Sequence, residues 1–67
     1  MFFYDGNCLH IGSYKSVSYV ENNKIIIILD KKKINIIGEV LKIISLNDSE
    51  MYIQGFIKII ELVEING

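Results

Sequence analysis

The sequence predicts an all-β fold, an antiparallel meander of about six to seven short strands that forms a sandwich or an open barrel. Isoleucine dominates the composition, tyrosine and phenylalanine are common, and alanine and proline are absent. β-Branched and aromatic side chains fit a pleated sheet, and a chain without alanine has little bias toward helix. Turn-forming residues also interrupt the chain about every 8 to 12 residues, a spacing typical of small all-β domains.

Polar turn residues separate the expected strands. We expect turns at Asp5-Gly6-Asn7, at Glu21-Asn22-Asn23-Lys24, at Asp30-Lys31-Lys32-Lys33 and at Asn47-Asp48-Ser49. Between most of them, apolar and polar residues alternate, as they do in strands with one buried face. The apolar residues that we expect to line the core are Leu9, Ile11, Val17, Ile34, Ile36, Leu41, Ile43, Ile53 and Ile57.

The segment 56–65 is compatible with a strand or with a helix. Lys58, Glu61 and Glu64 recur every three residues, which is a helical spacing. The segment nevertheless follows Gly55 directly and is rich in isoleucine, so we favour a long strand.

Residues 1–67 are expected to form a single domain, near the lower size limit for independent folding. Domains of this size usually need a disulfide, a metal or a partner subunit. Cys8 is the only cysteine, so no internal disulfide can form, and no cluster of cysteine and histidine predicts zinc. Self-association is therefore the expected supplement, and a lone thiol fits a reducing, cytoplasmic compartment.

The charge and hydropathy of the chain predict neither a nucleic-acid partner nor a transmembrane segment. The net charge is −1, which provides no attraction to nucleic acid or to anionic lipid. The N-terminus lacks the basic segment of a secretory signal and contains an acidic residue, Asp5. The longest apolar run, residues 25–29, is far shorter than the roughly 20 residues of a transmembrane helix.

A second apolar face is expected in addition to the core. Residues 25–29 do not alternate, and residues 40–46 carry apolar side chains on both faces, so these strands should be covered on both sides. A chain of this length offers one core, so the second face requires another chain, and we predict a homo-oligomer. The candidate assembly face comprises Ile25, Ile27, Leu29, Ile37, Ile44 and Leu46.

The residues that could perform chemistry predict no catalytic, cofactor or metal site. Cys8 and His10 lie on one face of a strand, but two ligands are too few for structural zinc. The only histidine lies near no serine nucleophile motif. The remaining candidates have simpler interpretations. The carboxylates lie in or beside turns, at Asp5, Asp30, Asp48 and Glu50. The lysines form a solvated loop, at Lys31, Lys32 and Lys33.

Two glycines lie between apolar segments. Gly38 follows Ile36-Ile37 and Gly55 follows Ile53-Gln54, and a further apolar segment begins after each of them. Glycine at the end of a strand supplies a bulge, a positive φ or a tight corner. We therefore expect Gly38 and Gly55 to form structural corners with backbone conformations that a branched residue cannot adopt.

Taken in order, these elements resemble the YabP/YqfC family of sporulation proteins over about residues 4 to 62. The resemblance is carried by Leu9-x-Ile11, Val17-Ser18, Ile25-x-Ile27, Ile34-x-Ile36-x-Gly38-Glu39-x-Leu41-x-Ile43-x-x-Leu46 and Ile53-x-Gly55-x-Ile57. It implies a non-enzymatic role in endospore formation in a Gram-positive bacterium, without a cofactor. It also implies a location in the mother cell or at the developing spore surface, with other spore-envelope proteins as partners.

A different function class remains open from the sequence. A small β-barrel could bind RNA or DNA as a ring, as Sm-like folds do, with residues 31–33 and the tyrosines as its contact surface. The acidic balance of the chain and the lack of a basic groove argue against this alternative.

Overall fold

Isoleucine-rich segments separated by polar turns form six antiparallel strands in the computed structural model, which describes residues 2–5 and 8–65. Over these residues there is no helix, so none is long and apolar enough to cross a membrane. The predicted all-β class is confirmed. The strands are β1 (Phe2–Tyr4), β2 (Cys8–Gly12), β3 (Ser16–Glu21), β4 (Lys24–Ile28), β5 (Lys32–Leu46) and β6 (Glu50–Glu64).

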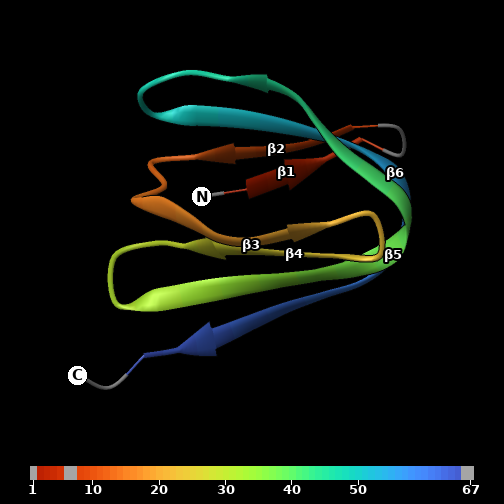
Figure 1. Cartoon of the computed structure of the whole chain (residues 1–67). Helices are drawn as coiled ribbons and strands as arrows, with labels where there is room; N and C mark the ends of the chain where they lie inside the picture. The colour runs from red at the N-terminus through yellow and green to blue at the C-terminus, as the bar shows by residue number, and fades with distance from the viewer. Residues whose placement is uncertain (1, 6–7, 66–67) are drawn as a thin grey trace.

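The strands form one sheet in the order β1-β2-β6-β5-β4-β3. β3 to β6 are a meander, and β2 pairs with the first part of β6. β5 and β6 each have 15 residues, and both curve through the right-hand side of Figure 1, so that the sheet folds over on itself. The β1–β2 hairpin lies along one arm of this curve and the β3–β4 hairpin along the other.

This folding of the sheet produces two layers. The β2 layer contains β1, β2, residues 50–54 of β6 and residues 42–46 of β5. The β4 layer contains β3, β4, residues 32–38 of β5 and residues 57–64 of β6. Buried side chains from both layers form a single cluster, so the core lies between them. The result is a sandwich made from one open sheet, not a closed barrel.

The core contains the residues that alternation predicted, with additions. All nine predicted positions are either buried or packed against the buried cluster. The additions are Ile25, Ile27 and Met51, none of which has exposed surface. The buried cluster comprises Leu9, Ile11, Ile25, Ile27, Ile34, Ile36, Leu41, Met51 and Ile53.

The isoleucine run of β4 alternates in burial although it does not alternate in sequence. Ile25 and Ile27 face the core, whereas Ile26 and Ile28 are half-buried on the outer side of the β4 layer. The expectation that Ile25 and Ile27 belong to an exposed assembly face is therefore wrong. Successive strand residues point to opposite sides, and identical side chains give no signal that distinguishes the two sides.

The two expected glycine corners lie inside long strands, not at strand ends. Gly38 lies within β5 and Gly55 within β6, and the apolar segments on either side of each belong to one continuous strand. Within the segment 56–65, residues 56–64 consequently belong to β6 and lie along β5, so the favoured long strand is confirmed and the helical alternative is wrong. Cross-strand pairing of its isoleucines outweighs the helical spacing of its charges.

A β-bulge forms the bend opposite Gly55. Glu39 pairs with Phe56 and Lys42 with Gln54, so Val40 and Leu41 together oppose the single residue Gly55. Val40 has φ of 55° and Gly55 has φ of 140°. A bulge adds one residue to one strand, which bends the strand and increases its twist. The sheet therefore folds over at this point.

The two glycines are required for different reasons. Gly55 has the positive φ that we expected, and a Cβ there would also lie 2.6 Å from the carbonyl oxygen of Val40. Gly38 has no positive φ, so the expectation of an unusual conformation is wrong at this position. A Cβ on Gly38 would instead collide with the carbonyl oxygen of Phe56, because the backbones of β5 and β6 approach closely there.

The loops fix the bend and the open side of the sandwich. Asn22 and Asn23 form the β3–β4 turn without a positive φ, and their carbonyl oxygens accept the Leu41 and Gly38 N–H groups at 2.8 and 3.1 Å. Between β2 and β3, Ser13 N–H donates to the Ser49 carbonyl and Lys15 N–H to the Ile28 carbonyl, both at 2.7 Å. This connection therefore ties one layer to the other.

The core assignment predicts a large difference between buried and exposed truncations. We expect Ile36→Ala and Ile53→Ala each to lower the free energy of unfolding by about 2–5 kcal/mol, because each leaves a cavity between the layers. Val20→Ala, at a position that is 50% exposed, should change it by about 0.5 kcal/mol or less. Urea denaturation measures all three, and equal midpoints would contradict the two-layer core.

The bulge predicts that substitutions at two facing positions, one on each long strand, change stability in opposite directions. Gly55→Ala should destabilise by about 1–3 kcal/mol, because alanine is strained at a positive φ. Val40→Asn should stabilise, because asparagine tolerates φ near 55° better than a β-branched residue and Val40 is 66% exposed. Thermal unfolding tests both variants, and a lower midpoint for Val40→Asn would refute the proposed strain.

Candidate assembly surface

The outer side of the β4 layer carries an apolar surface that we name the isoleucine face. Directly paired residues of antiparallel strands project to the same side. Tyr19 pairs with Ile26, and Ile37 pairs with Ile59, so these side chains form rows across the layer. The isoleucine face comprises Tyr19, Ile26, Ile28, Ile37, Ile59 and Val63.

Polar residues interrupt the isoleucine face. Lys33 lies between Ile28 and Val63 in one row, and a hydrogen-bonded polar pair lies in another. Asn35 pairs with Ile26 on one side and with Glu61 on the other, and its Nδ2 donates to Glu61 Oε1 at 3.0 Å. Asn35 Oδ1 is buried and has no hydrogen-bond partner among the described residues. An unsatisfied buried acceptor costs free energy, which a donor from a partner could recover.

The six residues of the predicted assembly face do not form one surface. Ile25 and Ile27 are in the core, and Leu29 is half-buried against it. Only Ile37 belongs to the isoleucine face. Ile44 and Leu46 are 44% and 54% exposed, but they lie on β5 in the other layer. The isoleucine face contains Ile26 and Ile28 where we expected Ile25 and Ile27. The prediction was therefore displaced by one residue along β4.

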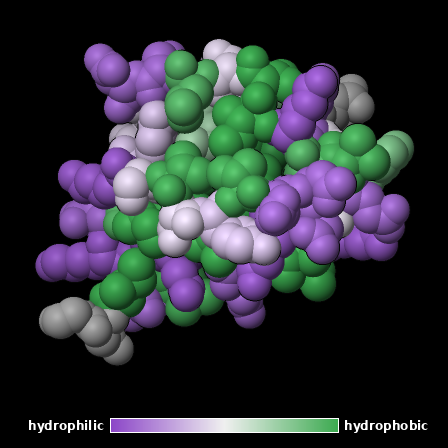
Figure 2. All heavy atoms as spheres, viewed as in Figure 1, coloured by the Kyte–Doolittle hydropathy of each residue, from purple (hydrophilic) through white to green (hydrophobic). Residues whose placement is uncertain are grey.

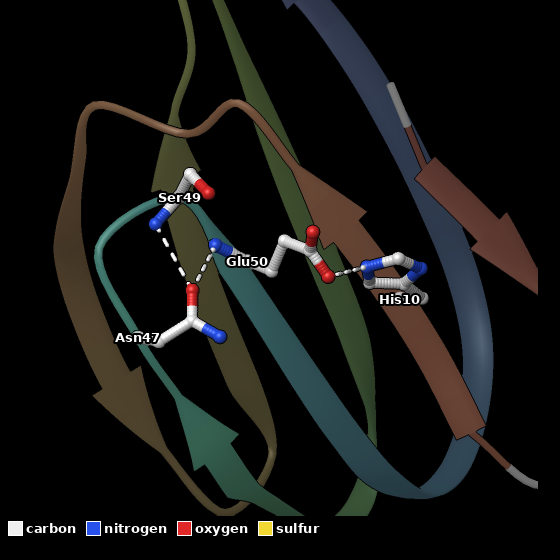
Figure 3. Close-up of polar contacts among 4 residues, drawn as sticks. All are labelled: His10, Asn47, Ser49 and Glu50. Carbon is white, nitrogen blue, oxygen red and sulfur yellow. Dashed lines mark hydrogen bonds and ion pairs between the residues drawn. The ribbon is translucent and has the colours of Figure 1, made fainter.

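The outer side of the β2 layer has a different character, with a histidine at its centre. His10 pairs with Tyr52, and their rings stack with centroids 4.4 Å apart and 2° between the planes. His10 Nε2 lies 3.0 Å from Glu50 Oε1 (Figure 3). Phe3, 64% exposed, pairs with His10 from β1. The contact with Glu50 could not be predicted from the sequence, because it depends on the register of β2 with β6.

The β5–β6 turn positions the Glu50 carboxylate. Asn47 Oδ1 accepts the backbone N–H groups of Ser49 and Glu50 at 3.1 and 2.9 Å (Figure 3). The Tyr14 hydroxyl donates to the Asn47 carbonyl at 2.5 Å. Asn47 therefore acts as a turn residue, as expected, and the turn brings Glu50 to the start of β6.

The described residues place no metal-binding or acid–base cluster near this histidine. Cys8 pairs with Gln54 and is half-buried, and no group of three or more potential ligands occurs in the described part of the chain. Asp5 Oδ1 accepts the Cys8 N–H at 3.0 Å, which is a turn role. The His10–Glu50 pair is part-buried on the outer side of the β2 layer, with the two side chains 34% and 46% exposed.

A groove lies beside the bulge, with a volume of about 610 Å³. Lys42 and Lys58 line it with Phe56 and Tyr4. Lys58 Nζ is 2.5 Å from Glu39 Oε2, and this hydrogen bond, with the attraction between the charges, lowers the pKa of the Glu39 carboxyl. Lys58 thus has an acidic partner within its own chain.

The three consecutive lysines do not form a single exposed loop. Lys31 is exposed in the β4–β5 turn with φ of 63°, whereas Lys32 and Lys33 belong to β5 and are half-buried. Their side chains alternate between the two sides of the strand. A nucleic-acid surface centred on these lysines would therefore be divided between two faces.

Apolar side chains are prominent on the surface of the described structure. Figure 2 shows them across the middle of one face, with hydrophilic side chains mostly around the margin. Large apolar residues with more than half of their surface exposed include Phe3, Val40, Leu46, Phe56 and Ile59.

Comparisons with protein-family models, with curated proteins and with solved structures find no match to the chain.

Proposed function

We propose that this protein is a non-enzymatic assembly protein that forms a homo-oligomer through its surface strands. The isoleucine face is the observation that carries the proposal. It contains apolar residues from every strand of the β4 layer, and two of them, Tyr19 and Ile59, are 46% and 52% exposed. Exposed apolar side chains that gather on one side of a sheet often mark interaction sites.

The size of the domain supports self-association. A small domain buries a low fraction of its surface, so the free energy available from its own core is limited. Each Å² of apolar surface buried against a second copy contributes about 25 cal/mol before the cost of association. Leaving isoleucines on the outer side of a strand is unfavourable for a solvated monomer, and packing them against a second copy removes this cost.

The proposed biological setting is the spore envelope or coat of a Gram-positive bacterium. It rests on the resemblance to YabP/YqfC sporulation proteins. In this setting the protein acts in the mother cell or at the developing spore surface, together with other spore-envelope proteins. A layer-forming role agrees with an apolar face and with the open edges of the sheet.

Self-association should depend on the isoleucine face. Sedimentation velocity at micromolar concentration should show oligomers of the unmodified chain. Ile37→Lys should shift the protein toward monomer, because a lysine within the packed face would lose its hydration. Phe3→Lys serves as the control, since Phe3 is more exposed but lies on the outer side of the other layer.

Circular dichroism of each variant establishes that the β structure is retained. A stable monomer for the unmodified chain at high micromolar concentration would overturn the assembly proposal. Oligomers that persist unchanged in Ile37→Lys would show that assembly uses another surface.

The proposed setting predicts a specific cellular distribution. In a spore-forming bacterium that encodes this chain, a fluorescent fusion should be produced during sporulation and should collect at the developing spore surface. Ile37→Lys in the same fusion should spread through the mother cell, because the assembled form would be lost. Uniform fluorescence of the unmodified fusion throughout vegetative growth would contradict the setting.

A further inference from the structure

The second half of β6 is the longest regular edge of the sheet. Residues 57–64 pair with β5, and over the described residues no second strand pairs with them. In Figure 1 this part of β6 forms the lower margin of the molecule. Its unpaired backbone groups are available to another strand.

The other edges are short or interrupted. β1 has 3 residues, and β3 contains a register shift at Ser18. The edge formed by the second half of β5 has a register shift at Ile44. Bulges and short strands disfavour pairing with another chain. The register of β6 with β5 is regular from Ile59 to Glu64, so this edge lacks such protection.

The polarity of this edge is symmetric about Glu61. Charged residues occur at Lys58, Glu61 and Glu64, and two apolar residues occupy each interval. If two copies pair antiparallel with Glu61 at the centre, each apolar residue from Ile59 to Val63 faces an apolar residue. The apolar pairs in this register are Ile59 with Val63 and Ile60 with Leu62.

Registers displaced by two residues lack this match. Centring on Ile60 places Ile59 opposite Glu61 and Lys58 opposite Leu62. Centring on Leu62 places Ile60 opposite Glu64. A displacement of one residue would bring opposite faces of the two strands together. The sequence of the edge therefore selects one two-fold register.

We propose that a second copy of this chain pairs with residues 59–63 of β6 in the register centred on Glu61. The proposal rests on the self-association proposed above and adds a contact along the sheet edge to the packing of the isoleucine face. Two copies related by a two-fold axis perpendicular to the sheet form an isologous interface. The β4 layers of both copies then become one continuous antiparallel sheet.

The exposure of Leu62 supports this arrangement. Leu62 pairs with Ile34 and so lies on the core side of its layer, yet it is 48% exposed. It is exposed because no strand of the described part of the chain lies beyond it. In the proposed register, Ile60 of the second copy lies next to Leu62, and the row from Ile36 through Ile60 continues across the interface.

Glu61 is the one unfavourable position, since two carboxylates would face each other on the axis. Asn35 reduces this cost. Its Nδ2 donates to Glu61 Oε1 at 3.0 Å from β5, on the side away from the edge. The Glu61 carboxylate is thereby drawn toward its own sheet.

Disulfide trapping tests the register. In a Cys8→Ser background, Glu61→Cys places two thiols opposite each other on the axis, where Cα atoms are about 4.5–5.5 Å apart. This separation permits a disulfide. Under mild oxidation we expect Glu61→Cys to form a covalent dimer, and the control Glu21→Cys, on the β3 edge, to remain mostly unlinked.

A charge on the edge provides a second readout. Leu62→Lys should weaken self-association at least about tenfold, because the lysine would be buried next to Ile60 of the second copy. Val20→Lys is the matched control: it is 50% exposed, on the core side of β3, at the opposite edge of the same layer. It should leave the dissociation constant unchanged within about twofold.

The outcomes separate the two proposals. A monomeric unmodified chain overturns both of them. An oligomer in which Glu61→Cys is no more readily linked than Glu21→Cys, or in which Leu62→Lys and Val20→Lys have equal effects, overturns the β6 contact and leaves the assembly function intact.

Discussion

The close passage of β5 and β6 at the bulge is the constraint on which the rest of the structure depends. Val40 and Leu41 oppose Gly55, and neither Gly38 nor Gly55 can carry a side chain without a collision with the facing backbone. Because both long strands bend together here, their halves can face each other across a core. Two carbonyl oxygens of the β3–β4 turn accept N–H groups of the bend, so a local hairpin and a long-range bend stabilise each other. One open sheet thus performs the role that two separate sheets have in most sandwiches.

The same bend determines which surfaces remain available. Bending turns one side of each layer toward the core, and the two outer sides differ in chemistry. The outer side of the β2 layer carries His10, Tyr52 and Glu50, whereas that of the β4 layer carries the isoleucine face. Bending also separates the second half of β6 from β2, which pairs only with the first half. A regular apolar edge is left next to an apolar face. The proposed assembly therefore follows from the geometry that creates the core.

Most of the fold was predictable, and the candidate surface was predictable only in part. Alternation identified core positions such as Ile34, because its polar neighbours Lys33 and Asn35 mark the opposite side of the strand. It failed for Ile25 to Ile28, where four identical residues give no contrast. The glycines identified the corners but suggested strand ends, since a bulge within a continuous strand depends on pairing between distant segments. The His10–Glu50 contact was unpredictable for the same reason.

Amide hydrogen exchange at two protein concentrations tests most directly whether β6 joins a second copy. In a dilute sample, the outward-pointing N–H groups between residues 59 and 64 lack partners and should exchange rapidly. At concentrations where the protein self-associates, these groups should become protected, whereas the outward N–H groups of β3 should exchange at the same rate in both samples. Protection that does not change with concentration, or that increases at β3 and not at β6, would contradict this account.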